Sequence, residues 1–240
     1  MTPGNVHDLW VYLAGTPLLW LTLTLLAFIA ADWIHLRFGR RALLNPVVLA
    51  VALLILVLWL TDTSYGRYFE GAQFVHFLLG PATVALAVPL YQQLADLRRH
   101  WRRILLGVLL GSATASTVAM GAAAMMGASL STILSLGPKS VTTPIAMGIS
   151  EKIGGEPTLT AIIVILTGIF GAVIAGPVLD LCRVRDPRAR GLAMGVSAHG
   201  IGTATAFDES ARTGAYAGMA MALSAVLTAV LLPLGLLGLR

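Results

Sequence analysis

The chain has 240 residues, of which 57% are hydrophobic and 11% are charged. A soluble domain carries roughly 25% charged residues, so this composition excludes an ordinary water-soluble domain and indicates a membrane protein. The formal net charge is +5, and the arginines stand in short segments between apolar runs, where they set membrane topology. We therefore expect no nucleic-acid partner.

Three membrane spans are predicted in the first hundred residues. They cover residues 9–30, 42–60 and 72–94. We expect the first to be retained rather than cleaved as a signal peptide, because no basic region precedes Trp10. The second span has an alternative start at Asn45-Pro46, since proline favours the first turn of a helix. Gly80 and Pro81 interrupt the third span.

The remainder of the chain predicts three further spans and two irregular segments. The spans cover residues 104–126, 157–181 and 213–237, and the irregular segments cover 129–150 and 191–207. Gly137, Pro138 and Pro144 predict a broken backbone in the first irregular segment. At membrane depth, such a backbone survives only when it is buried in protein or lines a wet cavity.

Three arginine clusters predict the topology. They hold eleven of the sixteen basic residues: Arg37, Arg40 and Arg41; Arg98, Arg99, Arg102 and Arg103; and Arg183, Arg185, Arg188 and Arg190. The positive-inside rule places these clusters in the cytoplasm and the N-terminus outside. Segment 129–150 must then enter and leave on the same face, as a re-entrant hairpin or two half-helices. Segment 191–207 either dips in from the cytoplasmic side or spans fully, and the sequence leaves both open.

An internal repeat supports this organisation. A shift of 60 residues aligns residues 140–154 with 200–214, with four identities in fifteen positions, and a long apolar helix follows each stretch. Related units of opposite orientation are typical of secondary transporters. We predict one all-α membrane domain over 1–240, with about six transmembrane helices plus two broken or re-entrant segments. It comprises three spans in 9–97 and a core at 104–240 with inverted-repeat units at about 129–181 and 191–237.

The run from Gly137 to Pro144 is the first candidate binding site. Lys139 is one of two lysines in the chain and lies in an apolar region, where an ionisable group is costly and usually functional. The hydroxyl side chains of Ser140, Thr142 and Thr143 stand beside it, and the half-helix beginning near Pro144 would offer free N–H groups. These groups suit a small carboxylate. The alternative is a lysine that extends to the interface from a loop.

The run from Ser197 to Thr205 is the second candidate site. Gly200 and Gly202 permit an unwound backbone, and His199 offers a proton or a cationic partner, with Thr203 and Thr205 as further binding groups. A structural histidine is the alternative.

A third group, Asp208 and Glu209, offers carboxylates for proton coupling alongside His199, although a solvated loop explains them as well. The sequence holds no HExxH motif, nucleotide-binding loop or paired-cysteine metal site, so we expect no enzyme, no metal and no cofactor.

Several of these runs closely resemble the LrgB family. The resemblance covers roughly residues 60–235 and is carried by the run Leu136-Gly-Pro-Lys-Ser-Val-Thr-Thr-Pro-Ile-Ala-Met147, by Ile153-Gly-Gly155, by Leu166-Thr-Gly-Ile-Phe-Gly-Ala172, by Arg185-Asp-Pro-Arg-Ala-Arg-Gly191 and by Ser197-Ala-His-Gly-Ile-Gly-Thr203. It implies a bacterial cytoplasmic-membrane protein with a small LrgA/CidA-like membrane partner. It also implies an antiholin-like role in murein hydrolase regulation and autolysis, with links to pyruvate or other small-acid uptake. A similar plant plastidial protein exports glycolate and glycerate.

Three functions follow as hypotheses. The first is a carrier in the lipid bilayer for small organic anions such as glycolate, glycerate, pyruvate or lactate. The second is a holin- or antiholin-like assembly that modulates autolysis, and the third is a structural partner for the LrgA-like protein. The broken segments with polar groups favour the carrier. Small-residue surfaces make a homodimer the expected oligomer.

Overall fold

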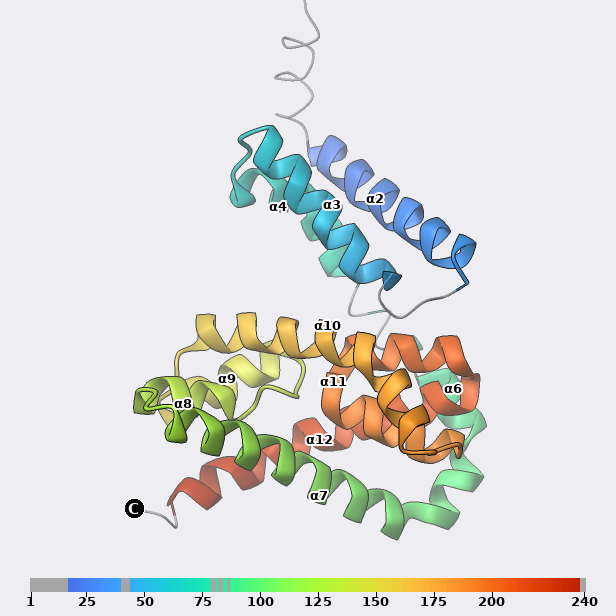
Figure 1. The fold of residues 1–240 in the computed structure, drawn as a ribbon, viewed down its shortest axis with the longest axis vertical. Coiled ribbons are helices and arrows are strands. Elements are labelled where there is room, and N and C mark those ends of the chain that lie inside the picture. The colour runs from blue at the N-terminus through green and yellow to red at the C-terminus, as the bar shows by residue number, and fades with distance from the viewer. Residues whose placement is uncertain (1–16, 40–43, 79–80, 82–83, 86, 238–240) are drawn as a thin grey trace, which may run out of the picture. The chain divides into compact units, whose positions relative to one another are not determined.

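The computed structural model describes residues 17–39, 44–78, 81, 84–85 and 87–237, and its described elements are all helices (Figure 1). They are α2 (Pro17–Arg37), α3 (Pro46–Leu60), α4 (Tyr65–Phe77), α6 (Ala87–Gln92), α7 (Leu94–Met125), α8 (Leu130–Leu136), α9 (Thr143–Ile153), α10 (Pro157–Leu181), α11 (Pro187–Glu209) and α12 (Ala211–Leu237). Within this part of the chain no strand occurs, and the all-α prediction is confirmed.

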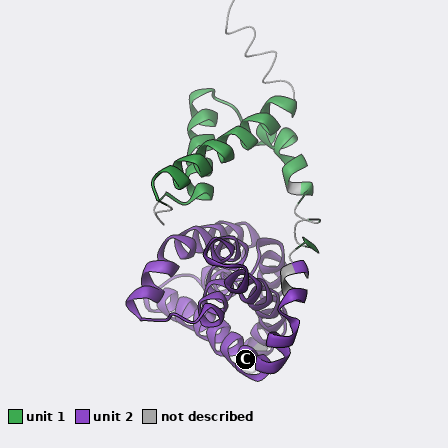
Figure 2. Ribbon diagram, turned by 90° about the vertical axis from the view of Figure 1, so that its right-hand side faces the viewer, with its two compact units in different colours: residues 1–85 green, residues 86–240 purple. Residues whose placement is uncertain are grey.

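The chain divides into two compact units, residues 1–85 and 86–240 (Figure 2). In the first unit, α3 and α4 pack on α2. The side chain of Asn45 accepts a hydrogen bond from the Val47 amide at 2.9 Å and so caps α3, which confirms the later of the two starts considered for this helix. Gly71 in α4 has no room for a side chain, because a Cβ there would lie 2.7 Å from that of Trp20.

The third predicted span is interrupted between α4, which ends at Phe77, and α6, which begins at Ala87. Pro81 is described in helical conformation, whereas Gly80 lies outside the described residues. Four described helices are long and apolar enough to cross a membrane: α2, α7, α10 and α12. These four agree with predicted spans, and α10 has the predicted bounds.

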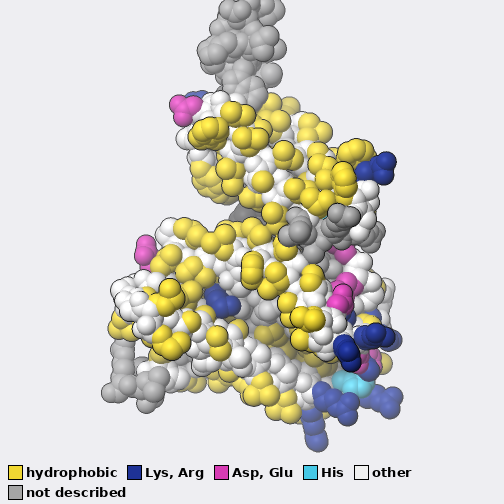
Figure 3. Space-filling model, in the orientation of Figure 1, with side chains coloured by type: hydrophobic (Ala, Val, Ile, Leu, Met, Phe, Trp, Pro, Cys, Tyr) yellow, Lys and Arg dark blue, Asp and Glu magenta, His cyan; other side chains and the backbone are white. Residues whose placement is uncertain are grey.

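Helix α7 is longer than the bilayer core requires. Its 32 residues extend about 48 Å, whereas the hydrocarbon core is roughly 30 Å thick. The cluster Arg98–Arg103 therefore lies in the first turns of a helix rather than in a loop, and the apolar part begins at Ile104. Arg188, in the first turn of α11, lies 3.7 Å from Asp96 in α7. We call this Arg-rich end of the second unit, with Arg98–Arg103 and residues 183–190, the basic end; Figure 3 shows a group of dark-blue basic side chains at one end of this unit.

The segment after α7 forms two half-helices, as predicted. Helices α8 and α9 are joined by residues 137–142 and lie between the last turn of α7 and the first turn of α10. The buried hydroxyl of Thr160 in α10 donates to Ser150 Oγ at 2.7 Å and lies 3.1 Å from the carbonyl oxygen of Ser135. Ser135 Oγ in turn accepts from the Glu156 amide at 2.7 Å. This hydroxyl network closes the base of a re-entrant hairpin opposite the basic end.

Helix α11 is a second hairpin, although it is continuous by hydrogen bonding. Its backbone is non-helical at Ala198 and His199. Arg190 and Glu209, at opposite ends of α11, form a bidentate ion pair with distances of 2.7 and 2.8 Å. In a straight helix these two residues would lie about 28 Å apart. The chain therefore reverses at the break and returns to the basic end, so of the two arrangements left open for 191–207, the re-entrant one is found.

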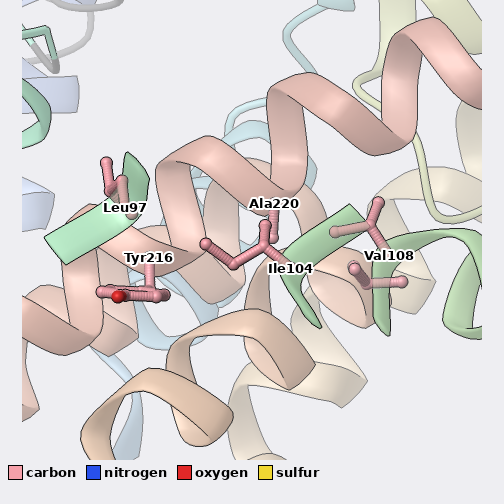
Figure 4. Close-up of a cluster of buried hydrophobic side chains, with 6 residues drawn as sticks. Leu97, Ile104, Val108, Tyr216 and Ala220 are labelled. Atoms are coloured by element: carbon pink, nitrogen blue, oxygen red, sulfur yellow. The ribbon is translucent and has the colours of Figure 1, made fainter. Parts of the chain in front are cut away.

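Both halves of α11 pack on α12. A side chain at Gly191 or Gly195 would collide with the Thr213 or Ala217 carbonyl of α12, so these backbones touch. Thr203, in the returning half, contacts the sulfur of Met221 at 3.8 Å. A core of buried side chains then joins α11 and α12 to α7 (Figure 4); its members are Leu97, Ile104, Val108, Val196, Tyr216 and Ala220. Many other large apolar side chains face outward, as in a lipid-exposed protein.

The two hairpins occupy equivalent places in the chain. Each consists of a break, a half-helix and a tight turn, followed by a long apolar helix, α10 or α12. They open at opposite ends of α10, as an inverted repeat requires. The half-helices that follow the two breaks begin at Thr143 and at Gly200. These two starts are separated by fewer than the 60 residues by which the sequence alignment was shifted. The difference arises because the first break has six residues and the second has two.

Candidate functional site

A hydrogen bond from the C-terminal half of α7 helps to fix the link between α8 and α9. The carbonyl oxygen of Gly137 accepts a hydrogen bond from Ser116 Oγ at 2.7 Å, and Pro138 is fully buried. Pro144 stands in the first turn of α9, where its missing N–H costs nothing. Thr142 occupies the N-cap position without a side-chain cap. The first N–H groups of α9 therefore receive no capping bond from the Thr142 side chain.

Lys139 lies in this link and is half-buried. Its ammonium nitrogen lies 3.3 Å from Ser140 Oγ, to which it donates. Among the described residues, no Asp or Glu oxygen lies within 4.0 Å of it. An ammonium group that is half-buried in an apolar region without a carboxylate is costly, and a bound anion would offset that cost.

His199 forms the turn of the second hairpin. Its φ is +41°, a conformation that favours glycine, and its side chain is 5% exposed. The ring Nε2 lies 2.9 Å from the carbonyl oxygen of Val164 in α10. Because a carbonyl can only accept, Nε2 carries a proton and donates. Thr203 Oγ1 donates to the His199 carbonyl at 2.8 Å, which satisfies that buried oxygen.

Two glycines of α10 make room for this turn. A Cβ at Gly168 would lie 2.5 Å from the His199 ring, and one at Gly171 would lie 2.6 Å from the Ala198 Cβ. Both distances are shorter than real contacts, so α10 accepts the break only where it lacks side chains. The break precedes Gly200 and Gly202, which are both helical.

A cleft of about 410 Å³ joins the two breaks. Lys139 lines it from the first hairpin and Ser197 from the second, and one face of α10 forms its wall. The lining residues are Lys139, Thr167, Phe170, Gly171, Ile174, Ala175, Val178, Leu179, Ala193 and Ser197. The cleft thus combines one ammonium group and two hydroxyls with an otherwise apolar surface, which is the chemistry of a site for a small organic anion.

The structure distributes the predicted site residues unequally. Lys139 lines the cleft, and the buried Ser140 holds the lysine. Thr142 and Thr143 stand at the start of α9, outside the cleft lining. His199 turns its ring to α10, and the hydroxyls of Thr203 and Thr205 donate to carbonyls one turn earlier in α11.

Sequence reasoning missed Thr167 and Ser197, the two hydroxyl residues of the cleft. Both stand in runs that carry the family resemblance, and Ser197 opens the second candidate run, but neither is charged and neither has a binding role in the sequence prediction. Thr167 could have been predicted from the small residues Gly168 and Gly171 that follow it on α10. Small residues on a helix indicate a face that packs closely against another segment.

At the basic end, Arg190 ties three chain segments together. It donates to Glu209 and to Asp180 at 2.6 Å, so it joins the end of α10 to both ends of α11. The hydrogen bond to Glu209 raises the pKa of Arg190. The side-chain bond from Arg188 lowers the pKa of Asp186, which also caps α11. Asp208 and Glu209 are both exposed, and Glu209 is engaged in the ion pair with Arg190.

Comparisons with known proteins identify the family. The model of the LrgB-like family matches residues 24–237, which extends the resemblance into the first unit. A relative named "Uncharacterized protein YwbG", from Bacillus subtilis (strain 168), is 40% identical over 210 residues, which cover 87% of this chain and 92% of the relative. No solved structure matches. The broken helices, the apolar exterior and this match lead to one conclusion: the chain is an integral membrane protein of the LrgB-like family.

Proposed function

We propose that the protein is a membrane carrier for small organic monocarboxylates of the glycolate, glycerate, pyruvate or lactate class. The observation that carries the proposal is Lys139: a half-buried ammonium without a carboxylate partner in the described residues, which lines a mostly apolar cleft where two helix breaks meet. In a low-dielectric setting, one fixed positive charge favours one negative charge on the ligand.

The two hairpins support a carrier rather than a fixed pore. They open toward opposite ends of α10, and their tips meet near its middle, at Val164 and Thr167. Inverted repeats with broken helices at the midplane are the architecture by which secondary transporters expose one site alternately to the two sides. In this arrangement Lys139, which Ser140 holds, pairs with the carboxylate in the cleft, whereas Thr142 and Thr143 stand at the start of α9 outside the cleft lining.

The location and chemistry follow from the same proposal. The basic end faces the cytoplasm of a bacterial cell and the N-terminus faces outside, because short loops rich in arginine remain inside. The protein works by binding and conformational change in the lipid bilayer, without catalysis and without a cofactor. His199 and Asp208 remain the groups proposed for proton coupling, whereas Glu209 serves mainly as the partner of Arg190.

A second function is favoured by a different feature, an apolar groove of about 380 Å³ between α7 and α12. A groove of this kind suits a packed helix, as in an antiholin-like assembly that modulates murein hydrolases and autolysis. Its occupant would be an LrgA/CidA-like small membrane protein or a second copy in a homodimer. This groove does not include Lys139, so the two functions predict different sensitive residues.

Replacement of the two lysines provides the test of the carrier. Lys139→Ala should abolish saturable uptake of radiolabelled lactate, pyruvate and glycolate into proteoliposomes, because the anion loses its only cationic partner in the cleft. Lys152→Ala is the matched control, since Lys152 is exposed in the last turn of α9, and this variant should transport normally. Lys139→Arg should retain partial uptake.

Size-exclusion profiles in detergent establish that each variant is folded. Normal saturable uptake by a folded Lys139→Ala variant would overturn the proposed site. Leakage of an uncharged dye at the same rate from all three preparations, without saturation by any acid, would favour the antiholin-like assembly instead.

A further inference from the structure

The cleft beside Lys139 has a definite direction along α10. Its wall residues recur at helical spacing from Thr167 to Leu179, so they form one face of the helix. Thr167 and Leu179 are twelve residues apart in the helix, which corresponds to a length of about 18 Å. Leu179 is next to Asp180, which pairs with Arg190 at the basic end. The cleft therefore runs from the middle of α10 toward the basic end.

The polar groups of the cleft are concentrated at its inner end. Lys139 contributes the ammonium, and the Thr167 hydroxyl makes no hydrogen bond within the described portion of the chain, so it is available to donate. The Ser197 hydroxyl already donates to the Ala193 carbonyl at 2.7 Å and is left as an acceptor. Lys139 and Thr167 therefore supply two donors to the cleft lining for a carboxylate.

The rest of the lining offers nothing to a hydroxylated ligand. Ile174, Val178 and Leu179 form the wall toward the basic end, with Phe170 beside them, and none has a side-chain donor or acceptor. A ligand hydroxyl placed there would lose its bonds to water without replacement, whereas a methylene group would gain by leaving water. The cleft volume of about 410 Å³ also falls in the range of sites that hold ligands larger than a two-carbon acid.

We propose that the preferred ligand is a monocarboxylate with an aliphatic tail of about four to six carbons, whose carboxylate pairs with Lys139 and whose tail lies along α10. This inference rests on the proposed carrier function and moves its preferred substrate from two- and three-carbon acids to longer aliphatic monocarboxylates. It assigns Ile174 and Val178 as residues that determine specificity. Hydroxylated two- and three-carbon acids such as glycolate and glycerate are then weak ligands, because they leave the apolar wall in contact with water.

A series of straight-chain acids tests the chain-length dependence. The full-length protein in proteoliposomes takes up radiolabelled pyruvate while unlabelled acetate, propionate, butyrate, pentanoate and hexanoate compete. Each added methylene from propionate to pentanoate should lower the half-inhibitory concentration about two- to fourfold, the range for partial to full burial of a CH₂ group. Glycolate and glycerate should compete more weakly than propionate and butyrate.

A matched pair of variants locates the effect. Ile174→Ser places a hydroxyl in the cleft wall and should reduce the preference for pentanoate over lactate about tenfold, from lost apolar contact and the new polar group. Ile162→Ser is the control: it lies on α10 outside the cleft lining, is mostly exposed, and should leave the preference unchanged.

The outcomes separate this inference from the carrier proposal. Saturable pyruvate uptake with no gain from propionate to pentanoate, or with glycolate and glycerate as the stronger competitors, overturns the aliphatic-tail inference and leaves the carrier intact. Equal changes of preference in Ile174→Ser and Ile162→Ser overturn the assignment of the wall. Absence of saturable uptake of every acid overturns the carrier proposal itself.

Discussion

The two helix breaks of this protein show two different ways to interrupt a helix inside a membrane. The link 137–142 is a true gap between α8 and α9, bounded by a buried proline and by Pro144 in the next helix. The break at Ala198 and His199 is only two residues long, and no proline stands in it. The first is therefore imposed by local sequence, whereas the second depends on its neighbours.

The neighbour that holds the second break is α10. Val164 accepts the hydrogen bond from the His199 ring, and Gly168 and Gly171 leave space for the turn. A non-glycine residue at positive φ costs about 1–3 kcal/mol and persists only when its surroundings fix it. Changes at Gly168 in α10 should therefore disturb the second break more than the first, and this comparison leads to four predictions.

The largest effect is expected from Gly168→Ala. The new methyl group would meet the His199 ring at 2.5 Å, and the variant should lose about 2–3 kcal/mol of stability, the usual cost of overpacking. The measurement is the apparent thermal midpoint in detergent. Gly176→Ala on the same helix has open space, and it should gain up to about 1 kcal/mol from helix propensity. Equal shifts in the two variants would show that α10 does not hold the second break.

A somewhat smaller effect is expected at the base of the first hairpin. Thr160→Val removes the hydroxyl that bonds to Ser150 and lies near the Ser135 carbonyl, and it leaves buried polar atoms without a partner. The expected loss is about 1–2 kcal/mol in the same melting measurement. Thr117→Val, whose exposed hydroxyl bonds only to its own helix, should change the midpoint little. A similar loss in both variants would contradict a special role for this network.

The backbone strain at the second break predicts that glycine at position 199 gives a more stable variant than alanine, the reverse of their usual order in a helix. Both His199→Ala and His199→Gly remove the ring and its bond to Val164, but only alanine retains the strained positive φ. The glycine variant should therefore be more stable by about 1 kcal/mol, although glycine normally weakens a helix by a similar amount. Thermal midpoints of the two variants measure the difference, and a more stable alanine variant would show that the backbone at His199 is relaxed.

The smallest effect is expected at the basic end. Arg190→Lys keeps the positive charge but cannot bond to Glu209 through two nitrogens while also reaching Asp180. We expect a loss of about 0.5–1 kcal/mol, reduced further at high salt because the pair is partly exposed. Midpoints at low and high ionic strength provide the measurement. A loss that does not depend on salt would indicate that packing, rather than charge, joins the hairpin ends.

The contrast between the breaks also explains what the sequence could predict. The bounds of α10 and the gap around Pro138 and Pro144 follow from local rules for apolar runs and proline, so both were predicted. The sequence predicted the second break at Gly200 and Gly202, which is too far along the chain. Its observed position depends on Gly168 and Val164, which are distant in sequence. The long helical start of α7 was not predicted, because the arginine cluster was interpreted as a loop. Arginine is in fact a good helix former.

The same limits apply to the cleft. Lys139 was found because a lone lysine in an apolar run is unusual. Thr167 and Ser197 were not, since a hydroxyl on a helix has no distinctive local signature, and only the meeting of α10 with α11 gives these residues a shared cleft. The reversal of α11 was similarly hidden, because the ion pair between Arg190 and Glu209 that reveals it joins residues at opposite ends of one helical run.

The turn after α10 gives the experimenter a native reporter of orientation. Cys182 is the single cysteine of the chain, it is exposed, and it directly follows the last residue of α10. A maleimide that cannot cross membranes should therefore label the wild-type protein in inverted vesicles but not in intact cells, if the arginine-rich side faces the cytoplasm. No engineered thiol is needed, so sidedness can be read from the unaltered polypeptide.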